Sequence, residues 1–322
     1  MGSRAALLRW TGRGRISDLQ GSVEHILRER RGRADVYAVG GTLVVRGNDP
    51  VGTCLLFEHL PGVAWTAAGY SGKGVGELAK SAALLAENYL KRGTKFTVEA
   101  EVTHDGPPSD LAGAVMASML GKAKGARASG RSPKHTFRAA MDGAQGAVGV
   151  EVTRGPGGAP VGDETVTCLV SGGAHSSVVA WNAMLSGYRV DLVHAESGEA
   201  SLLAAAKLYA ELSYRGDPRS LSLTVLEGGG CAGMIASHVA SAGSLVFAGF
   251  RPACPVPGFM RGMAEAPLYL LSEEAFDAQF RSLKLKAHVE KTDWNEAPAQ
   301  AYGKRSFGGK AADVSGVLDA LA

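Results

Sequence analysis

A short run of small and polar residues, Ser171 to Ser177, has the composition of a phosphate-binding loop. It follows the apolar pattern Thr165 to Val170, which predicts a buried strand, and precedes an apolar-periodic stretch that predicts a helix. Small residues at a strand-to-helix turn let backbone N–H groups approach a phosphate, and the helix start adds a positive dipole end. Because Ser171-Gly172-Gly173 is equally compatible with an ordinary tight turn, the loop needs support from its surroundings.

The segment immediately upstream gives that support. It reads Arg154-Gly155-Pro156-Gly157-Gly158-Ala159-Pro160-Val161-Gly162. This linker, followed by a strand and a Ser-Gly-Gly loop, resembles the junction in the tRNA 4-thiouridine synthetase (ThiI) family between the THUMP domain and the pyrophosphatase-type ATP loop (PP-loop). The order and lengths of the preceding segments are also similar to those of the N-terminal ferredoxin-like and THUMP domains in that family. The joint pattern argues against an unrelated nucleotide-binding enzyme of the α/β class.

The resemblance implies tRNA binding and, in active members, a reaction in which ATP adenylates a uridine before sulfur replaces the oxygen. It therefore implies ATP and Mg²⁺ as cofactors. Carried onto this chain, it assigns the nucleotide site to Ser171, Gly172, Gly173, His175, Ser176 and Ser177. His175 stands where family members place Asp, and an imidazole lacks the anionic oxygen that Mg²⁺ prefers. We expect weaker metal-assisted handling of phosphates, although His175 can still donate a hydrogen bond to a phosphate.

The residues for sulfur transfer also depart from the family pattern. The resemblance implies a Cys-x-x-Cys pair at the start of the helix after the third strand of the α/β domain, where this chain has Cys231 and Met234. A helix N-terminus lowers the pKa of a thiol, so Cys231 is the candidate catalytic thiol, with a buried structural cysteine as the alternative. Cys254 is a candidate second thiol by proximity in the fold. The Gly-Glu-Ser type loop of the family is replaced by Gly249-Phe250-Arg251.

Basic residues gather in two stretches. The N-terminal stretch contains Arg4, Arg9, Arg13, Arg15, Arg28, Arg30, Arg31 and Arg33. The second stretch, which has no acidic residue within it, contains Lys122, Lys124, Arg127, Arg131, Lys134 and Arg138. A solvated basic face is the ordinary explanation of such a run, but its place in the THUMP-like segment favours contact with tRNA phosphates. We expect recognition of RNA shape, because no base-reading aromatic residues are interleaved.

Three parts are expected to position these residues. Residues 1–72 are expected to form a ferredoxin-like α+β domain, residues 73–160 a THUMP α/β domain, and residues 161–322 a doubly wound parallel-sheet domain of the adenine nucleotide alpha hydrolase type. The strand patterns of the third part are Thr165 to Val170, Arg189 to His194, Leu221 to Leu226, Ser244 to Phe247 and Leu268 to Leu271. We expect the tail after Trp294 to be partly mobile before a short helix near Asp313 to Leu321.

The first two parts contain alternating strand and helix patterns. Those of residues 1–72 are a strand from Arg4 to Trp10, a helix from Ser17 to Arg30, a strand pair from Val36 to Val45 and a helix from Val51 to His59. A break at Ser71 to Gly74 separates them from the second part. The second part then has a helix from Val75 to Tyr89, a strand from Phe96 to Val102, a helix starting near Pro107 and two strands at His135 to Met141 and Ala147 to Thr153.

Composition sets outer limits on the function. The chain has 322 residues, of which 45% are hydrophobic and 20% charged, as in a globular protein of two or three domains. The net charge of +3 is too small to identify a nucleic-acid binder by itself. We expect a cytoplasmic protein, because no run of about 18 apolar residues occurs. The four cysteines and the histidines show no metal-ligand spacing, and Cys54 and Cys168 lie in apolar surroundings typical of structural thiols.

Two functions remain open from the sequence. The first is a tRNA-binding member of the family associated with tRNA thiolation whose own catalysis is impaired at His175 and Met234. The second is an active ATP-dependent tRNA sulfurtransferase that uses Cys231. The resemblance also implies a sulfur-donor protein as a partner, a homodimer and a link to thiamine biosynthesis, none of which has a signature in the residues. We expect no rhodanese extension, because the sequence ends soon after the α/β domain.

Overall fold

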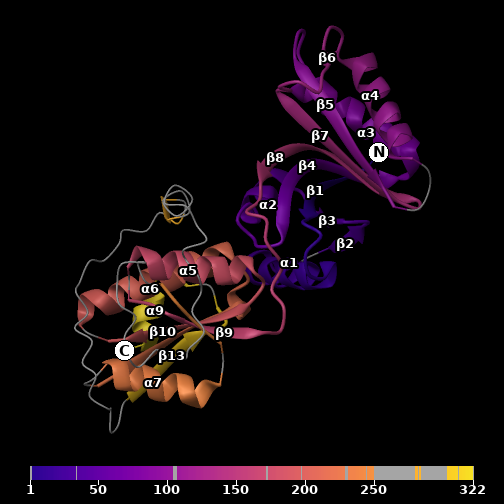
Figure 1. Cartoon of the computed structure of the whole chain (residues 1–322). Coiled ribbons are helices and arrows are strands. Elements are labelled where there is room, and N and C mark those ends of the chain that lie inside the picture. Colours follow the sequence, from indigo (N-terminus) through magenta and orange to yellow (C-terminus); the bar gives the residue numbers. More distant parts are fainter. Residues whose placement is uncertain are drawn as a thin grey trace. The chain divides into compact units, whose positions relative to one another are not determined.

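The computed structural model describes residues 2–33, 35–103, 107–171, 173–196, 198–228, 231–243, 245–249, 280–281, 283, 303–310 and 312–321. The chain divides into two compact units, Met1–Pro160 and Val161–Ala322. Within the described residues, the N-terminal unit contains an eight-stranded sheet and the C-terminal unit a five-stranded sheet (Figure 1). No helix among these residues is long and apolar enough to cross a membrane.

The N-terminal unit begins with a β-α-β-β-α-β arrangement. Its elements are β1 (Ser3–Trp10), α1 (Ile16–Arg31), β2 (Val36–Val39), β3 (Thr42–Arg46), α2 (Pro50–Leu56) and β4 (Val63–Lys73). The strands lie in the order β2-β3-β1-β4, and every neighbouring pair is antiparallel. Leu19, Val23 and Ile26 recur at helical spacing on α1 and are buried in one cluster with Phe57 and sheet residues. This is the ferredoxin-like arrangement that the sequence predicted.

The rest of the unit extends the same sheet. Its elements are α3 (Gly74–Tyr89), β5 (Lys95–Val102), α4 (Pro108–Lys122), β6 (Arg127–Ala128), β7 (His135–Asp142) and β8 (Gln145–Arg154). Because β8 pairs with β4, the full strand order is β2-β3-β1-β4-β8-β7-β5-β6. Leu78 of α3 and Val115 of α4 are buried in a second cluster with Phe96 and Phe137 of the sheet. The predicted helices and strands of this part are confirmed.

Strand β4 is an element that the sequence analysis missed. The predicted break at Ser71 to Gly74 is wrong, since Ser71 to Lys73 pair with Gln145 to Ala147 of β8 and α3 follows directly. β4 reads VAWTAAGYSGK, so it lacks the dense β-branched pattern by which strands are usually recognised. The sheet passes through residue 72 without interruption. A boundary between two domains at this residue stays a prediction.

The eight-stranded sheet curls, so that strands far apart in its order approach each other. Arg9 on β1 forms an ion pair with Glu101 on β5, although three strands lie between them in the sheet order. Small side chains dominate the buried cluster on the inner face, whose members are Ala5, Leu7, Val39, Val44, Ala67, Ala140 and Ala147. Gly69 faces Gly149 across the β4–β8 pair, at the junction of the two parts. Glycine and alanine at these positions allow the close backbone approach that the curvature requires.

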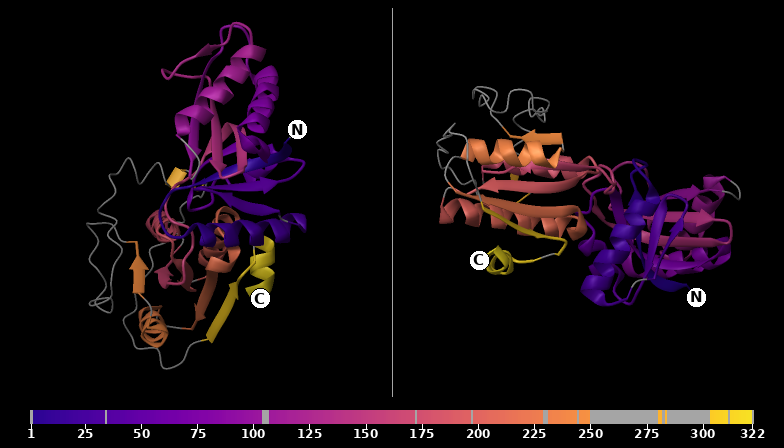
Figure 2. Two further views of the ribbon diagram at one scale, coloured as in Figure 1. Left: turned by 90° about the vertical axis from the view of Figure 1, so that its right-hand side faces the viewer. Right: turned by 90° about the horizontal axis from the view of Figure 1, so that it is seen from below.

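The C-terminal unit is a doubly wound sheet. Its elements are β9 (Thr165–Leu169), α5 (Ala174–Leu185), β10 (Arg189–Ala195), α6 (Glu199–Arg215), a short 3₁₀ helix (Pro218–Ser220), β11 (Leu221–Glu227), α7 (Cys231–Ala242), β12 (Leu245–Ala248), β13 (Gly303–Gly308) and α9 (Val314–Leu321). The order is β12-β9-β10-β11-β13, with the first four strands parallel and β13 antiparallel to β11. Helices α5, α6 and α9 cover one face and α7 the other (Figure 1). The right-hand view of Figure 2 shows the sheet between these layers.

The tail after Trp294 was only partly predicted. The helix expected near Asp313 is confirmed as α9, but residues 303–308 are not a mobile tail, because they form β13. The ring of Phe307 packs edge-on against Tyr209 of α6 at 5.2 Å between centroids, which ties the strand to the core. The predicted strand Leu268 to Leu271 lies outside the described residues.

The curvature can be tested at Gly69. A Cβ added there would meet the Val148 carbonyl oxygen and lie 2.5 Å from the Gly149 Cα, both on the paired strand. We expect Gly69→Ala to lower the free energy of unfolding by about 1–3 kcal/mol, the usual effect of overpacking. Urea denaturation of the full chain measures the change.

Gly113→Ala is the matched control. Gly113 lies on the exposed side of α4 with no atom within 4 Å of an added Cβ, so alanine there should stabilise the helix by up to about 1 kcal/mol. Equal effects of the two substitutions would contradict the proposed role of Gly69 in the bend.

Candidate functional site

The loop after β9 lies where the strand order of the C-terminal sheet reverses. The chain leaves β9 through α5 on one face and reaches the neighbouring strand β12 from α7 on the other face. In open α/β sheets, such a switch point leaves a crevice at the carboxyl ends of the strands, where ligands bind. Ser171 and Gly173 follow β9 at this edge and Gly249 follows β12, whereas Gly172 lies outside the described residues. The predicted strand-loop-helix setting of the loop is therefore present.

Backbone packs directly against backbone at this edge. A Cβ placed on Gly249 would lie 2.5 Å from the His175 carbonyl carbon, 2.6 Å from the Ser176 nitrogen and 2.7 Å from the His175 oxygen. No side chain fits at position 249 unless the first turn of α5 moves. The segment after β12 thus fixes the position of the turn that follows Gly173.

The serines of this turn are engaged within it. The Ser176 hydroxyl donates to the Gly173 carbonyl at 2.9 Å, and the Ser177 hydroxyl donates to the same oxygen at 3.1 Å. Both side chains are buried, whereas Ser171 is exposed and His175 is half-buried. An anion at this turn would meet first-turn backbone N–H groups, and the hydroxyls of Ser176 and Ser177 would reach it only by breaking those bonds. The nucleotide contacts assigned to these residues stay predictions.

His194, at the end of β10, acts as a structural connector. Its ring is 1% exposed, with Nδ1 2.9 Å from the Val170 carbonyl oxygen and Nε2 3.2 Å from the Ser201 hydroxyl. Burial lowers the pKa of His194, so the neutral ring is favoured. These contacts hold the end of β9 and the start of α6 to β10. Direct contact between the His194 ring and a ligand is not compatible with this burial.

A charged cluster that the sequence analysis missed lies at the same edge. Arg305 of β13 pairs with Glu196, at 3.2 Å, and with Glu227, which follow β10 and end β11 respectively. Glu196 is separated from Arg305 by 109 positions, and β13 was not predicted, so no sequence pattern could join them. The cluster links the carboxyl ends of β10 and β11 to the edge strand β13.

The structure describes the predicted sulfur-transfer residues only in part. Cys231 is the first residue of α7, which follows β11, and its side chain lies outside the described set. Met234 is fully buried among Leu169, Val193 and other residues between α7 and the sheet, so position 234 is a core position. Cys254 also lies outside the described residues. No group of three or more potential metal ligands occurs in the part of the chain that the structure describes.

Two further cysteines are structural thiols, as predicted. Cys54 and Cys168 are buried and unbridged. Burial raises the pKa of the Cys54 thiol to about 12, and burial also raises the pKa of Cys168. Neither thiol forms a thiolate readily, so neither is suited to nucleophilic chemistry.

Arg138 does not belong to the exposed basic surface that the sequence predicted. It is 8% exposed, its guanidinium pairs with Glu99 and Glu151, and it lies 4.8 Å from the Trp65 ring centroid. Arg138 projects from β7 onto the inner face of the curled sheet, where carboxylates from both neighbouring strands neutralise it. A phosphate would have to displace both carboxylates to reach it.

The other five predicted basic residues are exposed, and an earlier loop brings further basic residues beside them. The Gly93 N–H donates to the Gly125 carbonyl at 2.8 Å, and the Lys134 N–H donates to the Lys95 carbonyl at 2.8 Å. The resulting surface, the cationic tip, consists of Lys91, Arg92, Lys95, Lys122, Lys124, Arg127, Arg131 and Lys134, all exposed. Lys122 pairs with Glu87 at 3.2 Å. The start of the predicted strand at Phe96 was the signal that could have placed Lys91 to Lys95 beside the second basic stretch.

Comparisons with known proteins support the fold. No protein-family model matches the sequence, and no curated protein matches it. Among solved structures, PH1313 from Pyrococcus horikoshii is similar with a TM-score of 0.69 at 17% identity, over 88% of this chain and all of the other. A 4-thiouridine synthetase in complex with RNA and bound ATP is similar with a TM-score of 0.67 at 13% identity, over 99% of this chain and 95% of the other. The chain therefore has the multidomain α/β fold of a 4-thiouridine synthetase.

Gly249 gives a direct test of the candidate edge. We expect Gly249→Ala to displace the first turn of α5, because the added methyl group would overlap the backbone of His175 and Ser176. Hydrogen exchange should then show faster exchange of the Ser177 amide, which donates to the Gly173 carbonyl at 3.3 Å.

Gly173→Ala is the matched control for this experiment. Gly173 has φ −76° and ψ 160°, and the nearest atom to its added Cβ is the Ser171 Oγ at 3.5 Å, so alanine fits without strain. Unchanged exchange in Gly249→Ala would show that the turn does not depend on this contact.

Proposed function

We propose that this protein binds tRNA through its N-terminal unit and an adenine nucleotide at the loop after β9, and that it takes part in tRNA thiolation without completing the chemistry itself. The observation that carries the proposal is the cationic tip, eight exposed lysine and arginine side chains at one end of the N-terminal unit. The likeness of the whole chain to a 4-thiouridine synthetase in complex with RNA and ATP supports it.

The composition of the tip suits a nucleic-acid backbone. Lysine and arginine side chains neutralise phosphates and release counterions, which gives binding without sequence readout. Within the described part of the chain, Lys122 is the tip residue that forms an ion pair, and its partner Glu87 lies on α3 beside the tip. Backbone hydrogen bonds between the 91–95 loop and residues 125–134 hold the tip in place. We infer that it recognises the shape and charge of folded RNA.

The loop after β9 suits the phosphates of ATP. The turn between Gly173 and α5 offers backbone N–H groups at the start of a 12-residue helix, which favours negative charge. Ser171 is the exposed hydroxyl of the loop. Mg²⁺ would have no carboxylate at position 175, where the side chain is an imidazole, so the residues present fit the nucleotide better than the metal.

The same residues argue that catalysis is impaired. His175 replaces the loop carboxylate, and Met234 fills a core position where a second thiol would be needed. The alternative is an active ATP-dependent sulfurtransferase, and one observation favours it: Cys231 is the first residue of α7, the helix that follows β11. A sulfur-donor protein and a homodimer stay predictions from the resemblance under either function.

The RNA-binding part of the proposal predicts a weaker salt dependence in a tip variant. Lys124→Gln combined with Arg127→Gln should weaken tRNA binding and reduce the slope of log K against log salt concentration by about 2, or about 1 for each phosphate that is no longer neutralised. Filter binding over a salt series measures both quantities.

Lys80→Gln combined with Lys207→Gln removes the same charge from exposed positions outside the tip and is the control. Its slope should equal that of the unchanged protein. Equal reductions in the two double variants would mean that net charge, and not the tip, binds the RNA.

The catalytic part of the proposal predicts a gain of activity. With ATP, Mg²⁺ and tRNA, the unchanged protein should release pyrophosphate at background rate, and His175→Asp should raise that rate by roughly tenfold or more because a carboxylate restores a metal ligand. His59→Asp, on the N-terminal unit, is the control and should stay at background. tRNA-dependent release by the unchanged protein would establish the active sulfurtransferase instead.

A further inference from the structure

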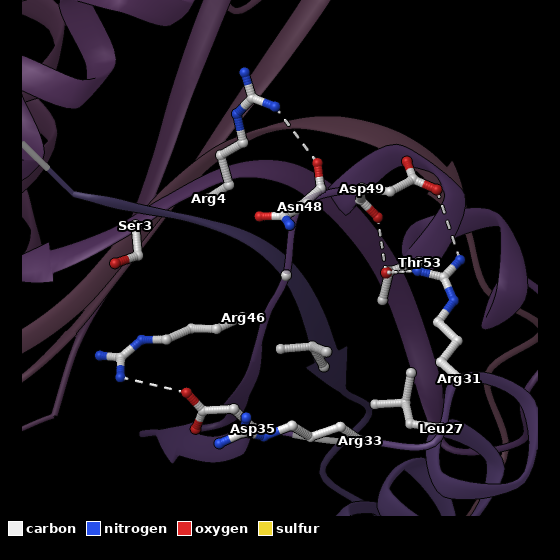
Figure 3. Close-up of a pocket in the computed structure, with 12 residues that line it drawn as sticks. Ser3, Arg4, Leu27, Arg31, Arg33, Asp35, Arg46, Asn48, Asp49 and Thr53 are labelled. Carbon is white, nitrogen blue, oxygen red and sulfur yellow. Dashed lines mark hydrogen bonds and ion pairs between the residues drawn. The ribbon is translucent and has the colours of Figure 1, made fainter.

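An arginine-rich hollow lies on the N-terminal unit, apart from the cationic tip in the sequence. It is open to solvent, has a volume of about 800 Å³, and is formed where the start of β1, the end of α1, the end of β3 and the start of α2 meet (Figure 3). Its charged lining residues are Arg4, Arg31, Arg33, Arg46, Asp35 and Asp49. We call this hollow the arginine cleft.

Two of the four arginines are held in place by carboxylates. Arg31 lies 3.7 Å from the Asp49 carboxylate and donates to the Thr53 hydroxyl at 2.9 Å. Asp49 is itself fixed, because it accepts a hydrogen bond from the Gly52 N–H at 2.9 Å. Figure 3 shows this pair at one side of the cleft.

The second pair lies at the opposite side of the view. Arg46 lies 3.5 Å from the Asp35 carboxylate (Figure 3). Arg46 also donates to the Ser71 hydroxyl at 3.3 Å and stacks 4.7 Å from the Tyr37 ring centroid. These contacts hold the guanidinium groups in place before a ligand binds. Less side-chain entropy is therefore lost on binding.

The remaining two arginines supply the uncompensated charge. Arg4 and Arg33 are exposed, and Arg4 donates to the backbone carbonyl of Asn48 at 3.5 Å, a long and neutral contact. Four guanidinium groups against two carboxylates leave the lining with a net charge of +2. The cleft therefore presents two positive charges in excess to solvent.

The charge and shape of the cleft define its ligand. A phosphate monoester carries a charge of about −1.5 to −2 at neutral pH and accepts paired hydrogen bonds from guanidinium groups, whereas a backbone phosphodiester carries only one negative charge. The described residues that line the cleft include no aromatic side chain, so they offer no aromatic surface on which a base would stack. Its wide mouth admits a phosphate attached to a large molecule.

We propose that the arginine cleft binds the 5′-terminal phosphate monoester of the RNA. This inference rests on the proposed RNA binding of the N-terminal unit. It adds a second contact, independent of the cationic tip, that distinguishes the phosphorylated end of an RNA from its interior. Free inorganic phosphate is the other source of the same chemistry.

The test compares one tRNA prepared with a 5′-phosphate and with a 5′-hydroxyl, bound to the full chain in a filter assay. We expect the phosphorylated tRNA to bind about tenfold more tightly, the ratio that corresponds to a charge-assisted hydrogen bond. Arg4→Gln combined with Arg33→Gln should reduce the ratio to about one. Asp35→Asn, which releases Arg46 from its carboxylate, should increase it.

Arg28→Gln is the control. Arg28 lies on α1, the helix that carries Arg31, but it is exposed and does not line the cleft. It should leave the ratio unchanged. A ratio of one in the unchanged protein, or a ratio that survives loss of Arg4 and Arg33, overturns the inference while the proposed function stands.

Two further outcomes are distinct. If neither tRNA binds, the proposed function fails and this inference fails with it. If calorimetric titration shows inorganic phosphate binding that depends on Arg4 and Arg33, while the two tRNAs bind equally, the cleft is a site for free phosphate and the assignment to an RNA end is wrong.

Discussion

The C-terminal unit depends on one close contact, between the chain after β12 and the first turn of α5. β9 lies between β12 and β10, and α5, which leads from β9 to β10, lies on the opposite face of the sheet from α7, which leads into β12. The segments that follow β9 and β12 therefore meet side by side at the carboxyl edge of the sheet. Gly249 permits this meeting, since any larger residue would overlap the backbone of His175 and Ser176. The serine hydroxyls that turn back onto Gly173 close the same turn. The position of the loop after β9 is thus set by packing, whether or not a nucleotide binds there.

The N-terminal unit uses small residues for a different purpose. Alanines on the inner face and the Gly69–Gly149 pair let a single sheet curl, so that helices occupy its outer face and charged residues occupy much of the inner one. The curvature determines which arginine side chains are buried and which are exposed. Arg138 is neutralised by Glu99 and Glu151 on the inner face, whereas Arg127 remains exposed at the end of the sheet. Identical side chains close together in sequence therefore have different functions available to them.

The sequence predicted the fold and the helices well because their signals are local. The apolar patterns of β9, β10 and β11, which alternate with helical patterns, were sufficient to predict a doubly wound sheet. β4 and β13 were missed, since glycine-rich and alanine-rich strands are recognised only by the partner that they pair with. The burial of Arg138 and the pairing of Arg305 with Glu196 depend on long-range interactions. No local pattern contains that information.

Hydrogen exchange of the full chain with and without ATP shows whether the turn after β9 holds a nucleotide. We expect saturable protection of the amides of residues 173–177 and of Gly249, with the cationic tip unchanged. Saturable binding of ATP that leaves these amides unprotected and protects another surface would show that the nucleotide binds elsewhere. Exchange that ATP does not alter at any concentration would equally contradict a nucleotide site at this turn.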